Sequence, residues 1–167
     1  GIDVARANGL GHVSGSTGST SEKAVIARYD LPEIALMDMG DFVGGMLKYM
    51  RRNPVANLTI AGGFAKMVKL GQGAIDLHSA RSQVDFTALA DLAAACGYDH
   101  DMVANANSVL DVVQQGTPEM RVKLANAIAA AAQKTALGVI AGAAVNIEIL
   151  VVARDSQING TAGTIAP

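Results

Sequence analysis

The chain has 167 residues, of which half are hydrophobic and 17% are charged. A chain of this length and composition can bury one core, so the sequence predicts a folded domain and excludes a disordered segment. The net charge is −2 and the isoelectric point is about 5.9. Because proteins that bind nucleic acid generally carry a basic excess, we expect no nucleic-acid partner.

The only cysteine, Cys96, excludes an internal disulfide, and such cysteine usage favours the reducing cytoplasm. The chain begins with Gly1 and shows no charged-then-apolar leader, so it is interpreted as a piece of a longer cytoplasmic protein. Its longest apolar run, residues 125–144, contains Gln133 and Lys134, whereas a membrane-spanning helix needs about 20 mostly apolar residues. We therefore expect a buried helix and no membrane partner.

The first half alternates apolar runs, glycine turns and helix signals, after a short helix at residues 3–8. The expected strands are residues 12–15, 34–39 and 58–61. Helices are expected to start at Ser19, which opens a Ser-x-x-Glu capping box, at Asp41 as a cap, and at Phe64. The strands begin about 22 to 24 residues apart, a spacing that favours βαβ units with parallel strands.

The second half is predicted to be mostly helical. One helix is expected over residues 82–96, one or two shorter helices within residues 99–115, and one helix over residues 117–138. The last of them starts at Thr117-Pro118-Glu119, which combines a cap, a proline in the first turn and an acid at the positive end of the helix. Residues 145–152 alternate apolar residues with Asn146 and Glu148, which predicts a strand with one solvated face near a sheet edge.

These elements together predict an α/β fold. It consists of a largely parallel sheet of βα units flanked by helices, a helix-rich second half and a final edge strand. Residues 1–155 are expected to form a single α/β domain. Residues 156–167 are rich in Gly and Thr, which predicts a loose tail.

Three polar glycine turns follow the three expected parallel strands. They contain Gly15, Thr17 and Gly18, then Asp38, Gly40 and Asp41, then Gly62 and Gly63. Because the carboxyl ends of parallel strands meet at one edge of a sheet, we expect the turns to lie together and to bind a ligand through backbone N–H groups. Asp38 or Asp41 could accept a hydrogen bond from a ribose. None of the turns has the GxGxxG or P-loop pattern, so simple tight turns are the alternative.

Basic and polar side chains follow the third turn. Lys66 and Lys69 lie one helical turn apart, and His78, Ser79 and Arg81 follow in an expected loop. Two lysines near the positive end of a helix could bind carboxylates, and Arg81 could clamp an anion. His78 could bind a carboxylate or move a proton. The alternatives are solvated surface lysines and a histidine bonded to its own turn.

The sequence indicates neither a metal site nor a catalytic triad. His12, His78, His100 and Cys96 are scattered along the chain without the spacing of metal ligands. Cys96 is interpreted as a small buried apolar residue. The catalytic residues therefore stay unassigned at the level of sequence.

Two stretches carry a resemblance to a known family. Residues 39–44 read MGDFVG, and residues 59–79 contain Gly62-Gly63, the Lys66-x-x-Lys69-Leu70 helix, Gly73 and Leu77-His78-Ser79. This pattern resembles the CbiD family of cobalamin biosynthesis, over residues from about 3 to 155. The resemblance covers only the later half of the family. Members often carry His after the first glycine, where this chain has Gly63.

The resemblance implies transfer of a methyl group from S-adenosylmethionine to ring carbon 1 of cobalt-precorrin-5B. It implies that the glycine turns hold S-adenosylmethionine, and that the lysines, His78, Ser79 and Arg81 contact carboxylates of the tetrapyrrole substrate. It also implies a partner segment, the preceding half of the same protein. Apolar surface left without that segment is expected to make the chain a homo-oligomer. The alternative function is a non-catalytic ligand-binding or oligomerisation domain of a biosynthetic assembly.

Overall fold

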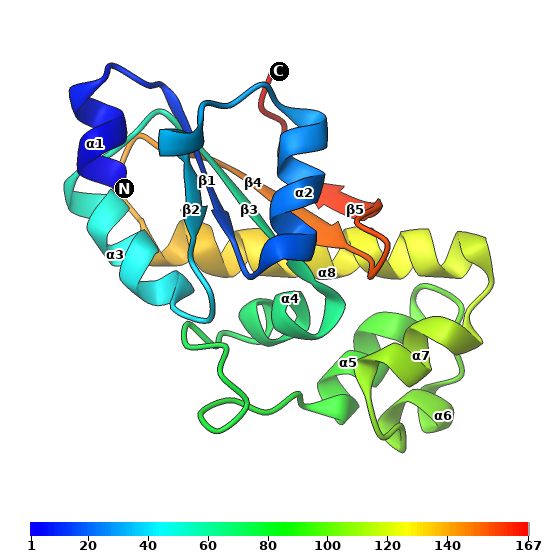
Figure 1. Ribbon diagram of the computed structural model, residues 1–167. Coiled ribbons are helices and arrows are strands. Elements are labelled where there is room, and N and C mark those ends of the chain that lie inside the picture. The colour runs from blue at the N-terminus through cyan, green and yellow to red at the C-terminus, as the bar shows by residue number, and fades with distance from the viewer. Residues whose placement is uncertain (167) are drawn as a thin grey trace.

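The computed structural model describes residues 1–166 and shows a five-stranded sheet between helices (Figure 1). The strands are β1 (His12–Ser16), β2 (Leu36–Asp38), β3 (Asn57–Gly63), β4 (Asn146–Val152) and β5 (Ile158–Ala162). The helices are α1 (Ile2–Ala7), α2 (Ser19–Arg28), α3 (Val43–Arg52), α4 (Phe64–Gly71), α5 (Phe86–Ala94), α6 (His100–Ala104), α7 (Val109–Gln115) and α8 (Pro118–Val139). The α/β fold expected from the sequence is confirmed.

The strand order is β2-β1-β3-β4-β5, and all neighbours are parallel except β4 and β5. The chain therefore moves from β1 outward to β2, then returns across β1 to form β3. Because βαβ connections are right-handed, such a reversal places the helices before and after it on opposite faces of the sheet. The reversal point lies between β1 and β3, and open α/β sheets bind ligands outside the carboxyl ends of the strands at such a point.

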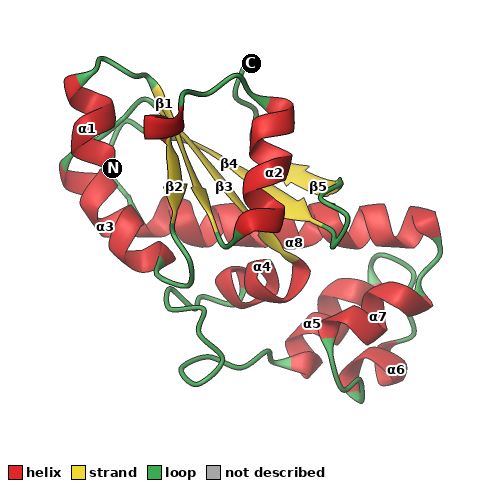
Figure 2. Ribbon diagram, viewed as in Figure 1, coloured by secondary structure: helices red, strands yellow, loops and turns green. Residues whose placement is uncertain are grey.

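The two faces of the sheet carry different covers (Figure 2). One face packs against α2 alone, through Val25 and Tyr29 on Leu150 and Val152. The other face is covered by α3, α4 and α8 and holds the larger core, which includes Leu58, Ile60 and Ile149 of the sheet together with Leu47, Met50, Leu124 and Ile128 of the helices. Helix α8 runs behind the sheet in Figure 1. Helices α5, α6 and α7 lie together beside the first half of α8.

Side-chain caps fix the helix starts in the second half. The caps are Asp85, Asp99, Ser108 and Thr117, each of which accepts a hydrogen bond from a backbone N–H in the following turn. Thr117-Pro118 starts α8 as the sequence predicts. The helix expected from Ser82 begins instead at Phe86, because Asp85 is the residue that caps it.

Two expected caps in the first half are wrong. Helix α2 begins at Ser19 itself, after Gly18, and Ser21 Oγ donates back to Gly18 O at 2.8 Å in place of a capping box. Helix α3 begins at Val43 after Phe42, and Asp41 forms an ion pair with Lys66 rather than capping it. At the first helix start the local turn is bonded through Ser21 rather than Ser19, and at the second a tertiary ion pair takes the carboxylate of Asp41.

The end of the chain also differs from the expectation. Residues 158–162, taken as part of a loose tail, form β5 and pair antiparallel with β4. Strand β4 is therefore an interior strand rather than the edge, and Glu148, expected on a solvated face, is fully buried. The strand expected at residues 34–39 shortens to β2, because residues Glu33–Ala35 form a 3₁₀ turn.

Two further findings concern residues 1–166. None of their helices is long and apolar enough to cross a membrane. Nor do these residues bring together three or more side chains in the arrangement of a metal site.

Candidate functional site

The three glycine turns meet at one edge of the sheet, as predicted. They follow β1, β2 and β3, which are mutually parallel in the order β2-β1-β3. Backbone hydrogen bonds join them: Thr17 N donates to Ala61 O at 3.0 Å, and Met39 N donates to Ser16 O at 2.9 Å. The turns are thus held together before any ligand binds.

Lys66 links the turns through its side chain. Its ammonium donates to Thr17 O at 3.0 Å and lies 3.0 Å from Asp41 Oδ1, an ionic contact without hydrogen-bond geometry. The two side chains keep about 35% and 22% of their surface exposed. The positive charge of Lys66 is therefore held at the reversal point and already shared with Asp41.

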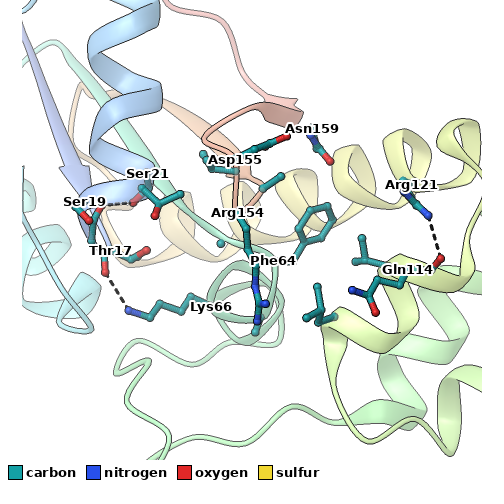
Figure 3. A pocket seen from close by; sticks show the side chains of 18 residues that line it. Thr17, Ser19, Ser21, Phe64, Lys66, Gln114, Arg121, Arg154, Asp155 and Asn159 are labelled. Atoms are coloured by element: carbon teal, nitrogen blue, oxygen red, sulfur yellow. Dashed lines mark hydrogen bonds between the residues drawn. The ribbon is translucent and has the colours of Figure 1, made fainter.

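A cleft of about 860 Å³ opens beside this junction (Figure 3). Its walls come from residues 17–21 after β1, residues 63–66 after β3, and residues 152–155 after β4. Helices α7 and α8 close the far side with Gln114 and Arg121. Three consecutive parallel strands therefore deliver their carboxyl ends to one cleft, in agreement with the general placement of ligand sites in such sheets.

Two helices begin at this cleft without a side-chain cap among the described residues. They are α2, after Gly18, and α4, after Gly63. The first N–H groups of a helix have no partner within the helix and carry partial positive charge. Both helices therefore direct hydrogen-bond donors toward the same cleft, which suits an anionic or carboxylate group.

Two of the predicted glycines are closely packed against neighbouring side chains. A Cβ on Gly62 would lie 2.6 Å from Met67 Cε and 2.9 Å from Thr17 Cγ2, and a Cβ on Gly15 would lie 2.6 Å from Met46 Sδ. By contrast, Gly63 lines the cleft, and the nearest atom to an added Cβ there is Val152 O at 4.0 Å. Close packing explains the first two glycines, while Gly63 leaves open space.

Some of the predicted site residues line the cleft and others lie elsewhere. Those on the wall of the cleft are Thr17, Gly18, Gly63 and Lys66. Gly40 has a φ of 55°, which glycine adopts readily, and shapes the turn before Asp41. Asp38 lies in a second hollow, between α1, β2 and α3.

The remaining predicted residues lie along the segment after α4. Lys69 Nζ donates to Leu77 O at 3.1 Å and so holds this segment to the helix. His78 and Arg81 are exposed: Ala80 N donates to His78 Nδ1 at 3.2 Å, and Arg81 lies 3.5 Å from Asp76. Ser79 is exposed beside them. None of these four residues is among the described residues that line the cleft.

Sequence reasoning missed Arg154, Arg121 and Gln114 in the cleft. Arg154 follows β4 directly, so the rule that located the other turns would have found it had β4 been recognised as a parallel interior strand. Arg121 and Gln114 reach the cleft through the packing of α7 and α8. Nothing in the local sequence indicates that packing.

A buried polar cluster lies under α2, nearer the amino ends of the strands. The carboxylate of Glu148 accepts from Arg28 at 2.9 Å, from Tyr29 at 2.6 Å and from Thr59 at 3.2 Å. His12 Nε2 is 2.9 Å from the Thr59 hydroxyl. Burial lowers the pKa of His12, and burial together with the bond to Glu148 raises the pKa of Tyr29. Both shifts keep the His12 ring and the Tyr29 hydroxyl uncharged at neutral pH.

The chain is thus a doubly wound α/β domain with a polar, glycine-bordered cleft at the reversal point of its sheet, where ligand sites of such folds generally lie. Residues 76–163 match the family described as CbiD, C-terminal domain. The chain belongs to the CbiD family. No solved structure matches it.

Curated relatives agree with this membership. The chain is 52% identical over 161 residues to the cobalt-precorrin-5B C(1)-methyltransferase of Brucella anthropi, which covers 95% of this chain and 44% of the relative. It is 51% identical over 166 residues to the protein of the same name from Halorhodospira halophila, and this match covers 98% of this chain and 44% of the relative. The protein of that name from Methylorubrum extorquens is 52% identical over 158 residues, at 93% and 44%. The chain thus spans less than half the length of these relatives.

Proposed function

We propose that this chain is the later part of a methyltransferase that acts on ring carbon 1 of cobalt-precorrin-5B and gives cobalt-precorrin-6A, in the oxygen-independent synthesis of cobalamin. The main structural support is the cleft of about 860 Å³ at the reversal point of the sheet. A cleft of this volume is in the range that holds organic ligands. The relatives named for this reaction supply the identity of the substrate.

The proposed methyl donor is S-adenosylmethionine, which supplies an electrophilic methyl group. As the ring carbon forms its new C–C bond, the C–S bond breaks and its electron pair stays on sulfur. The protein then has to hold the two reactants in line and to exclude water, and it needs no nucleophilic side chain of its own. A cleft built from rigid strand ends and backbone donors suits this task.

The turn after β1 is the proposed site of the donor's carboxylate. Thr17 and Gly18 line the cleft, and the uncapped start of α2 follows them. Backbone N–H groups at a helix start bind carboxylates without a charged side chain. The open space at Gly63, on the facing wall, would let the donor approach the backbone of α4.

The proposed partners are the tetrapyrrole substrate and the part of the relatives that lies outside the matched region. An apolar hollow of about 530 Å³ beside β2 is a candidate contact for that part, because Met37, Met39 and Met46 line it and Phe42 is 69% exposed there. Without such a cover, an exposed apolar patch favours self-association. We therefore propose that the isolated chain forms homo-oligomers and is incomplete as an enzyme.

Calorimetry and a turnover assay together test the proposed function. We expect S-adenosylmethionine to bind both to the 167-residue chain and to a longer chain that includes the preceding segment, with methyl transfer to cobalt-precorrin-5B only by the longer chain. If neither chain binds the donor, the proposed function is wrong. Robust turnover by a monodisperse monomer of the 167 residues would overturn the proposal that the chain is incomplete.

The two lysines are expected to differ in their effect on ligand binding. Replacing Lys66 with Met removes a charge from the cleft wall and releases Asp41, so affinity for donor or corrinoid should fall by about 1–3 kcal/mol. Lys69→Met is the matched control, because Lys69 donates to Leu77 O outside the cleft wall. Calorimetry on both variants checks this, with circular dichroism to verify folding. Equal loss from both variants would contradict the assignment of the cleft.

A further inference from the structure

The basic side chains at the cleft are not equivalent. Lys66 is held by Thr17 O and Asp41, and Arg121 donates to Gly116 O and Gln114 O, each at 2.9 Å. Arg154 is exposed, and within residues 1–166 its side chain forms neither a hydrogen bond nor an ion pair with another side chain or the backbone. Figure 3 shows it extending across the cleft beside Phe64, between Lys66 and Gln114.

The backbone that carries Arg154 is well fixed. Val152, two residues earlier, pairs with Gly63 in the parallel β3–β4 ladder. Ala153 N then donates to Gln157 O at 2.9 Å, and Gln157 N donates to Asp155 Oδ1 at 3.0 Å. The neighbouring carboxylate of Asp155 is thus engaged in its own turn. The guanidinium of Arg154 stands on a rigid base with its donors free for a ligand.

The charge of the cleft points to an anionic ligand. Its wall carries three cations, Lys66, Arg121 and Arg154, against the single carboxylate of Asp155. The uncapped starts of α2 and α4 add two positive helix ends. A guanidinium presents a planar fork of donors that matches a carboxylate in two parallel hydrogen bonds.

We propose that Arg154 binds a peripheral carboxylate of the tetrapyrrole and so selects a substrate with free carboxylate side chains. This assignment rests on the proposed function. Arg154 lies toward Phe64 and Gln114, whose apolar ring and exposed amide suit the edge of a macrocycle. The donor carboxylate has a separate place at the start of α2, so the two ligands should depend on different residues.

The test measures binding by the folded 167-residue chain to two probes. The first is cobyrinic acid, a corrinoid with free carboxylates, and the second is S-adenosylhomocysteine, the demethylated donor. Arg154→Gln should lower the affinity for cobyrinic acid about 10- to 100-fold, because a charge-assisted pair of hydrogen bonds is lost. Arg154→Lys should recover part of this, because it keeps the charge without the fork. Neither variant should change the affinity for S-adenosylhomocysteine.

Arg52→Gln is the matched control, because Arg52 is also an exposed arginine and lies at the end of α3, outside the cleft. It should leave both affinities unchanged. A second comparison uses the amidated counterpart of cobyrinic acid, whose weaker binding should not respond to Arg154→Gln. The assignment is overturned if Arg154→Gln leaves cobyrinic acid binding intact, if it weakens both probes alike, or if the parent chain does not bind cobyrinic acid.

The same data keep this proposal apart from the proposed function. A selective loss of cobyrinic acid binding in the Arg154→Gln variant supports the role of Arg154, even if S-adenosylhomocysteine does not bind. In that case the proposed donor site is wrong. If S-adenosylhomocysteine binds and Arg154→Gln does not change the corrinoid affinity, the proposed donor site is supported and Arg154 is not part of the substrate site.

Discussion

Replacing Gly160 with alanine should lower the free energy of unfolding by about 3 kcal/mol. Gly160 lies in β5 directly against helix α8, where an added Cβ would fall 2.6 Å from both the Cβ and the carbonyl oxygen of Ala125. Neither contact is the flexible end of a side chain, so β5 or α8 has to move. Urea unfolding followed by circular dichroism measures the loss.

The control for this prediction is Gly45→Ala. Gly45 lies in α3 with open space around it, so alanine there should be neutral or should add about 0.5–1 kcal/mol through lower chain entropy in the unfolded state. A Gly160→Ala variant as stable as the parent chain would mean that β5 does not pack on α8.

The parallel part of the fold could be predicted from local signals. Apolar runs ending in glycine turns located β1, β2 and β3, and their spacing predicted parallel pairing, which in turn placed the three turns at one edge. Thr117-Pro118 located the start of α8 because a cap and a first-turn proline are local features. These predictions succeeded where a few neighbouring residues determine the conformation.

Strand β5 could not be predicted, because its conformation depends on distant contacts. Its sequence, Ile-Asn-Gly-Thr-Ala, has little strand propensity. It is held by pairing with β4 and by Asn126 Oδ1 of α8, which accepts from Thr161 N at 2.9 Å. A strand of this kind follows from the fold around it, not from its own residues.

The candidate site also contains residues that the local sequence predicts and residues that it does not. Thr17, Gly18, Gly63 and Lys66 follow strands that were recognised, and they line the cleft. Arg121 comes from a helix 55 positions beyond Lys66, and its approach depends on how α7 and α8 pack. Side chains that reach a site through helix packing leave no pattern in the local sequence.

Glu148 is the clearest case of a polar residue misread from periodicity. Its place in the alternation of β4 suggested a solvated face, yet the residue is fully buried. Its partners, Arg28 and Tyr29, lie 120 and 119 positions away in the chain. The cluster is asymmetric, because the Arg28 side chain is 36% exposed while that of Glu148 is not exposed at all.

This asymmetry predicts which partner is costlier to remove. Arg28→Met leaves a buried carboxylate without its cation, with only the Tyr29 and Thr59 hydroxyls to stabilise it, and should cost about 3 kcal/mol of unfolding free energy. Glu148→Gln leaves a partly exposed guanidinium that water can solvate, so its cost should be smaller, about 1–2 kcal/mol.

A double-mutant cycle measured by urea unfolding decides whether this asymmetry holds. The variant with both changes should be more stable than Arg28→Met alone, because a neutral amide replaces the stranded charge. Lys23→Met, an exposed change earlier in α2, is the control and should alter stability by less than about 0.5 kcal/mol. Strictly additive effects, or a larger loss from Glu148→Gln than from Arg28→Met, would show that the buried carboxylate does not depend on Arg28. The stability of the α2 face would then come from the apolar contacts of Val25 and Tyr29 rather than from the ion pair.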